Sequence, residues 1–87
     1  MNDKDILLKA LEKYGANAQI VMVFEEMAEL QKELCKYLRG RQNEAEIAEE
    51  IADVRIMLDQ MELLFGLDTE SIRRKKLDRL SERVNKS

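Results

Sequence analysis

The stretch EEMAELQKELCKYLRGRQNEAEIAEEIADV, at positions 25–54, decides the fold because it joins two helical patterns through a single glycine. Apolar residues recur every three or four positions on both sides of Gly40, as they do on one face of an α-helix. The connection is only a few residues long, so the two helices should pack antiparallel. Within the stretch, EEMAEL (25–30) and EEIADV (49–54) resemble each other, and each sets carboxylates among residues expected in a core.

Two further helices flank this pair. We expect the first helix to run from Asp3 to Tyr14 and to end at Gly15 in a left-handed cap. The second should begin at an N-cap on Asn17 and end near Arg39. The third should begin at Asn43, with Glu46 completing a capping box, and end at Gly66. The fourth should begin at Asp68 or Thr69 and reach about Val84.

Each of the last three helices has an apolar side that predicts its buried face. The chain is therefore expected to form one all-α domain over residues 1–87, a four-helix antiparallel bundle. Phe24 is also expected in the core. The buried sides are Ile20, Val23, Met27, Leu30, Leu34 and Leu38 in the second helix, Ile47, Ile51, Val54, Leu58, Met61 and Phe65 in the third, and Ile72, Leu77, Leu80 and Val84 in the fourth.

Composition excludes several classes of protein. Histidine is absent, which removes the commonest general base and most zinc, haem and di-iron sites. The single cysteine, Cys35, cannot form an internal disulfide, so we expect a buried, inert thiol in a reducing cytoplasm. No apolar run is long enough to span a membrane. The net charge of −3 gives no support to nucleic-acid binding.

The acids of the two central helices stand in unusual positions on the helical wheel. Glu50 falls inside the apolar arc of the third helix, and Asp53 lies on the same side one turn further on. Glu26 borders the apolar stripe of the second helix, with Glu29 and Glu33 beyond it. An isolated EExxE motif is typical of a solvated helix face, and an isolated ExxD motif is no more specific. Two such motifs on adjacent helices instead favour a shared metal site.

A divalent cation would remove the cost of bringing these carboxylates together. Carboxylates that share a site repel one another. Burying a carboxylate without a partner costs on the order of several kcal/mol of folding free energy in desolvation. Oxygen ligands without nitrogen or sulfur suit Mg²⁺, with Mn²⁺ as a possible substitute.

The pattern E25-E26-x-x-E29, followed by E50-x-x-D53, resembles the signature of the MazG-like all-α nucleoside triphosphate pyrophosphohydrolases. The segments KYGANAQIVMVFEEMAELQKEL and IAEEIADVRIMLDQM are similar to the short, single-domain members found in bacteria and phages, over about positions 13–80. The resemblance implies Mg²⁺-dependent hydrolysis of a nucleoside triphosphate to a monophosphate and pyrophosphate. It also implies a homodimer or homotetramer with sites near subunit interfaces.

Carried over residue by residue, the resemblance makes Glu26, Glu29, Glu50 and Asp53 the magnesium ligands. Glu25 and Glu29 become the candidates for orienting the attacking water. Glu33 and Glu49 are read as surface acids, with an additional ion as the alternative.

Substrate contacts are less defined by the sequence. Lys76 and Arg79 share one side of the fourth helix, and KKLDRL partly matches a Lys-x-x-Arg element of the family, which makes them phosphate-binding candidates. The family's asparagine and second arginine are replaced by Arg74 and Leu80, and a solvated helix face explains the pair equally well. The base-binding candidates are Tyr14, Tyr37 and Met57, and simple packing is the alternative for each.

Two other functions stay open at this point. A non-enzymatic helical oligomerisation module would explain the amphipathic helices but not Glu50. A phosphoribosyl-ATP pyrophosphohydrolase would share both the architecture and the acids. Because a chain of 87 residues can hardly cover all its apolar stripes, we expect a homo-oligomer under any of these functions.

Overall fold

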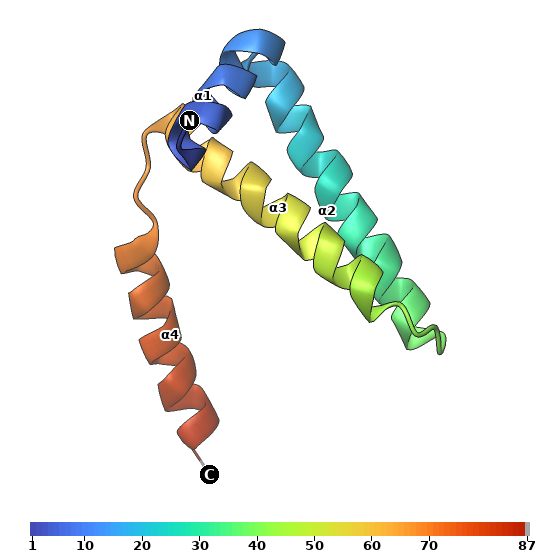
Figure 1. Cartoon of the computed structure of the whole chain (residues 1–87). Helices are drawn as coiled ribbons and strands as arrows, with labels where there is room; N and C mark the ends of the chain where they lie inside the picture. The colour runs from blue at the N-terminus through green and yellow to red at the C-terminus, as the bar shows by residue number, and fades with distance from the viewer. Residues whose placement is uncertain (87) are drawn as a thin grey trace.

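The computed structural model describes residues 1–86, which form four α-helices and no β-strand (Figure 1). The all-α prediction is confirmed. None of the described helices is both long and apolar enough to cross a membrane. The helices are α1 (Asp3–Tyr14), α2 (Ala16–Leu38), α3 (Glu44–Phe65) and α4 (Glu70–Asn85).

The three glycines lie at the predicted helix ends. Gly15, between α1 and α2, differs from the prediction because it does not adopt the left-handed cap conformation. Gly66 closes α3 in the left-handed conformation, at φ 64° and ψ 41°, and its N–H donates to the carbonyl of Glu62. Gly15 has a positive φ of 91° but an extended ψ of 154°. Because α2 follows immediately at Ala16, the predicted N-cap at Asn17 is wrong, and Asn17 lies inside the helix.

The start of α3 also departs from the prediction. Asn43 occupies the N-cap position but makes no capping hydrogen bond, so the capping box with Glu46 does not form. Instead, the Asn43 side chain turns toward α2 and donates to the backbone oxygen of Glu33 at 2.9 Å. The amide therefore fastens the two helices together at their connection.

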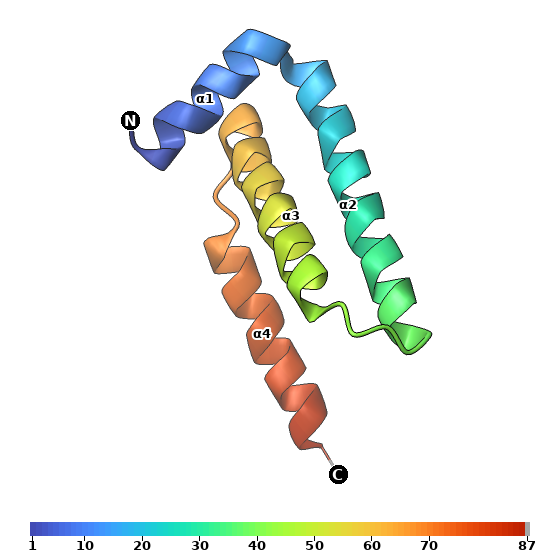
Figure 2. The ribbon, with the colours of Figure 1, turned by 45° about the vertical axis from the view of Figure 1, so that its right-hand side comes forward.

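α2 and α3 form an antiparallel hairpin, and α1 lies across the end where α3 finishes (Figure 2). One buried amide fixes α1 in this place. The Gln60 side chain is 2% exposed, and its Nε2 donates to the carbonyl of Leu7 at 3.0 Å. This bond joins residues 53 positions apart in the chain.

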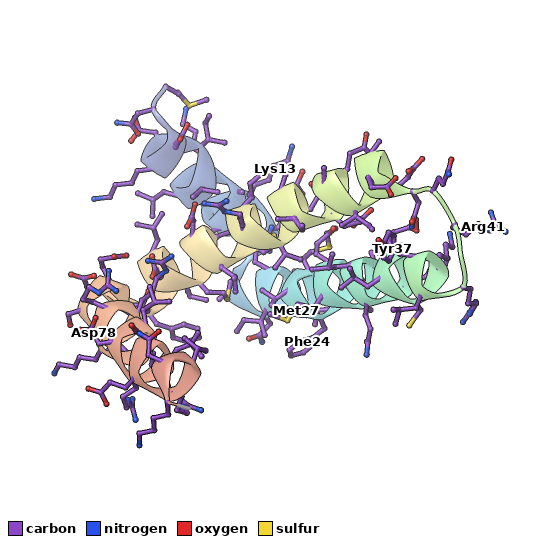
Figure 3. All side chains as sticks on the ribbon, turned by 90° about the horizontal axis from the view of Figure 1, so that it is seen from below. Lys13, Phe24, Met27, Tyr37, Arg41 and Asp78 are labelled. Carbon is purple, nitrogen blue, oxygen red and sulfur yellow. The ribbon has the colours of Figure 1, made fainter. Side chains whose placement is uncertain are left out.

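The seam between α2 and α3 is more polar than the sequence predicts. Val23 and Met57 are its buried apolar side chains, and the other buried residues are Gln19, Glu33, Asn43 and Gln60. Phe24 and Phe65 are 62% and 58% exposed, so their assignment to the core is wrong for the single chain. Figure 3 shows Phe24 on the side of α2 that faces away from α3. The other exposed residues that were expected to be buried are Met27, Leu34, Cys35 and Leu38 in α2, and Ile51 and Leu58 in α3.

α4 stands apart from the other three helices within the described chain (Figures 1 and 2). Ile72, Leu80 and Val84, predicted to be its buried side, are 52%, 47% and 71% exposed. The antiparallel packing of α4 on α3, expected from the short connection, is therefore absent from the single chain. The radius of gyration is 16.2 Å, whereas a compact domain of this length has about 12 Å.

Candidate metal centre

Three carboxylates from the two hairpin helices meet at one point of the seam. Glu26 comes from α2, and Glu50 and Asp53 come from successive turns of α3. One oxygen of each lies within 4.8 Å of the others. The antiparallel pairing produces this arrangement, because residues three apart on a helix share one side and that side faces Glu26.

The cluster is partly shielded from water, and its charges are crowded. Glu26 and Glu50 are half-buried, while Asp53 is exposed. Burial raises the pKa of Glu26 above 4.5, and the charges of Asp53 and Glu50 raise it further. Burial, followed by the charge of Asp53, likewise raises the pKa of Glu50. Each shift means that the folded chain resists a full set of negative charges at this place.

One oxygen of the cluster is buried without a partner. Glu50 Oε2 is shielded from solvent and has no hydrogen bond with the protein. A buried polar atom of this kind normally finds a donor, a water or an ion. The cluster therefore offers an unmet requirement for positive charge.

The other two predicted acids lie outside the three-carboxylate group. Glu29 is exposed one turn beyond Glu26, yet its charge contributes to the raised pKa of both Glu26 and Glu50. Glu25 is also exposed, and it lines a groove of about 680 Å³ together with Tyr14 and other α1–α2 residues. The groove is otherwise lined by Ala18, Gln19, Val21 and Met22.

The three candidate base contacts are separated by the fold. Met57 is buried and lines a small hollow with Glu26, Asp53 and Ile56. Tyr14 is 59% exposed in the groove of Glu25. Tyr37 lies in the last turns of α2, about 16 Å along the helix from Glu26 at 1.5 Å per residue. Met57 is thus the candidate that the hairpin brings directly beside the acids.

The phosphate-binding candidates do not reach the acids within one chain. Lys76 and Arg79 belong to α4, which packs on none of the other described helices. Lys76 shares the apolar side of α4 with Ile72, Leu77 and Leu80. These cations can meet an acid cluster only if α4 moves or if a second chain supplies the cluster.

The fold uses Glu33 in a way that the sequence reading missed. Glu33 was expected on the surface, but it is 8% exposed in the seam. Lys36 Nζ lies 3.2 Å from its Oε2, and Asn43 Nδ2 lies 3.5 Å from its Oε1. The bond with Lys36, helped by that from Asn43, lowers the pKa of Glu33 below 4.5. Glu33 follows Glu26 by two helical turns, and this spacing was the signal that both lie on the same side.

No family model, curated protein or solved structure matches this chain.

Proposed function

We propose that this protein is a Mg²⁺-dependent nucleoside triphosphate pyrophosphohydrolase that releases a nucleoside monophosphate and pyrophosphate. The observation that carries the proposal is the convergence of Glu26, Glu50 and Asp53 across the α2–α3 seam. The resemblance of the same acids to the MazG-like signature names the reaction.

The donor set fits a hard divalent cation. All available ligand atoms are carboxylate oxygens, and Mg²⁺ and Mn²⁺ prefer such ligands. The unpartnered Glu50 Oε2 and the raised pKa values of Glu26 and Glu50 are what a site lacking its positive charge would show. Glu26, Glu50 and Asp53 would hold the ion, and Glu29 would complete the set from the next turn of α2.

The acids would have two different roles: some would hold the metal ion, and a neighbouring one would act on the attacking water. Bound magnesium would neutralise charge on the phosphate oxygens and lower the pKa of a water. A carboxylate next to the ligands, Glu25 or Glu29, would orient the attacking water and accept its proton. The water oxygen would bond to the α-phosphorus, the bond to the bridging oxygen would break, and pyrophosphate would leave.

Other residues would hold the substrate. Met57 lies beside the acids, and Tyr14 shares a groove with Glu25, so both could contact the base. Tyr37 would do so only if a second chain brought it near a cluster. Lys76 and Arg79 would contact the distal phosphates under the same condition.

A homodimer or homotetramer belongs to this proposal. The support for it is the set of large apolar side chains that one chain leaves in water on α2, α3 and α4. Large exposed apolar areas mark association sites in soluble proteins.

The test is a panel of ribo- and deoxynucleoside triphosphates, with phosphoribosyl-ATP included, incubated with the protein and Mg²⁺ or Mn²⁺. We expect a monophosphate and pyrophosphate to accumulate from at least one substrate, and Glu50→Gln to abolish the signal. Glu12→Gln, which removes a charge from α1 instead, serves as the matched control. Absence of monophosphate from every substrate with either metal would overturn the proposal.

A helical interaction module without catalysis is the second candidate, and the exposed apolar sides favour it. The two candidates differ in their response to metal. The enzyme should unfold at a higher temperature in millimolar Mg²⁺, because the ion relieves repulsion in the seam. The module should show neither this stabilisation nor turnover.

A further inference from the structure

A groove lies at the junction of α1 and α2, where Tyr14 ends the first helix. Its volume is about 680 Å³, and small-molecule pockets in proteins span about 300–1,000 Å³. Such pockets combine mainly apolar walls with a few polar groups that orient the ligand. The groove has both, because its walls are Tyr14, Ala18, Val21 and Met22, and its polar groups are Gln19 and Glu25.

The Gln19 side chain is a buried amide without a partner in this groove. Gln19 is 7% exposed, and none of the side-chain hydrogen bonds within residues 1–86 involves its amide. The comparable side chain of Gln60 is 2% exposed and donates to the carbonyl of Leu7 at 3.0 Å. A buried amide normally has such a partner. The Gln19 amide therefore presents a donor and an acceptor to the occupant of the groove.

The groove leads toward the acid cluster along one side of α2. Met22 precedes Glu26 by four residues, and Glu25 precedes Glu29 by four, so each pair shares a side of the helix. Gln19 lies seven residues before Glu26, about 10.5 Å along the helix axis. A nucleotide whose α-phosphate lies at the acids can bridge this interval and place its base in the groove.

The two polar groups of the groove differ in what they accept from a base. The Gln19 amide donates and accepts, so it can bind either an amino edge or an oxo edge by rotating its end. An ionised carboxylate such as that of Glu25 only accepts. The amino group of adenine or cytosine has two N–H donors, one for each side chain. The oxo group of uracil or hypoxanthine would instead direct an oxygen at the carboxylate, which repels it.

We propose that this groove binds the base of the nucleotide and selects adenine or cytosine over the oxo bases uracil, thymine and hypoxanthine. Gln19 binds the edge of the base, and Glu25 discriminates between amino and oxo groups. The identity of the ligand as a nucleotide rests on the proposed function. Glu29 then remains the carboxylate that orients the attacking water.

Nucleosides test the groove without metal, phosphate or turnover. Cytidine and uridine differ in one amino or oxo group on the ring, and so do adenosine and inosine. In chelator, titrations followed by NMR of labelled methionine methyl groups should show cytidine and adenosine binding roughly tenfold more tightly, the discrimination of a well-placed pair of hydrogen bonds. The Met22 methyl signal should shift in these titrations, because Met22 lines the groove.

Two variants separate the roles of the polar groups. Glu25→Gln replaces the acceptor with a group that also donates, so cytidine and uridine should bind about equally. Gln19→Leu removes the amide and should weaken the binding of both nucleosides, yet it should leave the unfolding temperature unchanged or higher, because the amide has no partner to lose. Gln60→Leu is the matched control: it removes the bond to Leu7 and should lower the unfolding temperature without changing nucleoside binding.

Contrary results overturn the proposal in distinct ways. Equal binding of cytidine and uridine by the unaltered protein would remove the base preference. Absence of a Met22 shift at millimolar nucleoside would remove the groove as a site and leave its amide to water. Shifts at Met57 alone would place the base in the hollow beside Glu26 and Asp53 instead.

The proposed function fails by a different observation. If cytidine binds in the groove and no triphosphate releases a monophosphate, the hydrolase is overturned and the groove stands as a nucleoside site. If the hydrolase is active, its kcat/KM should favour CTP over UTP by the factor measured with the nucleosides. An active enzyme that hydrolyses CTP and UTP equally well would overturn the base preference alone.

Discussion

The α2–α3 seam and α4 are built from similar amphipathic sequence, yet they differ sharply in burial. The seam buries Glu33 and Asn43 along with two apolar side chains, and it leaves one oxygen of Glu50 without a partner. In α4, Ile72 and Leu80 lie in water although their spacing is that of a buried side. Helical periodicity therefore specifies the helix, whereas burial depends on which surface is within reach.

The largest expected effect concerns the seam. Glu50→Gln should lower turnover by about 100-fold or more, comparable with the loss of one electrostatic contact to a transition state. In metal-free buffer the same change should raise the free energy of unfolding, because it removes one of the crowded charges. Steady-state kinetics and urea unfolding measure the two effects. Glu82→Gln in α4 is the control, and a destabilised Glu50→Gln without metal would contradict a seam strained by repulsion.

Truncation of an apolar side chain should distinguish the two regions next. Met57→Ala should cost about 2–5 kcal/mol, the range for a large side chain removed from a core. Leu77→Ala in α4 should mainly weaken association, so its effect should grow on dilution. Thermal unfolding over a hundredfold range of protein concentration separates these behaviours. Equal effects of the two variants at every concentration would contradict the distinction between the α2–α3 seam and α4.

Loss of the amide at the hairpin connection should have a smaller effect. Asn43→Ala removes the bonds to Glu33 and should cost about 1–3 kcal/mol, the range for leaving a buried polar group without its partner. Asn85→Ala in α4, whose amide is exposed, should stay within about 0.5 kcal/mol. Urea unfolding of both variants provides the comparison. A neutral Asn43→Ala would mean that water replaces the amide at no cost.

The smallest expected effect is a dependence of stability on pH. The pKa values of Glu26 and Glu50 are raised above 4.5 in the folded chain, so the folded state binds protons more tightly there than the unfolded state. Stability should therefore fall as pH rises from 4.5 through the raised pKa values. Glu33 has a lowered pKa, so its stabilising contribution is lost only below 4.5.

Unfolding in chelator at several pH values tests this dependence. The decline above pH 4.5 should be flatter in Glu50→Gln and should be reversed by Mg²⁺. Stability that rises over the same range in chelator would contradict the crowding of Glu26 and Glu50.

Much of the fold follows from local sequence signals. Gly40 and Gly66 lie at the predicted helix ends, because their positive φ angles suit the chain after a last helical turn. The meeting of Glu26, Glu50 and Asp53 was also predictable, since it needs only helical spacing and an antiparallel hairpin. The glycine positions depend on neighbouring turns, and the acid cluster depends on helical spacing and one short antiparallel connection, so both can be read from the sequence.

Other features depend on competition between distant groups. Asn43 could cap its own helix or bind Glu33, and the structure shows the second choice, which periodicity cannot reveal. The apolar side of α4 was assigned to a core that one chain does not provide. The sequence shows that α4 has an apolar side, but it does not show which surface covers that side.

The bond between Asn43 and Glu33 has a consequence for the length of the hairpin turn. Glu26 lies seven residues before Glu33, and Glu50 lies seven residues after Asn43, so both are displaced by the same two turns, about 10.5 Å. The Asn43 amide thus fixes the register of α2 against α3, and this register places Glu26 opposite Glu50. An insertion between residues 34 and 42 that keeps this bond would leave the acids aligned, whereas one between 44 and 49 would slip them past each other.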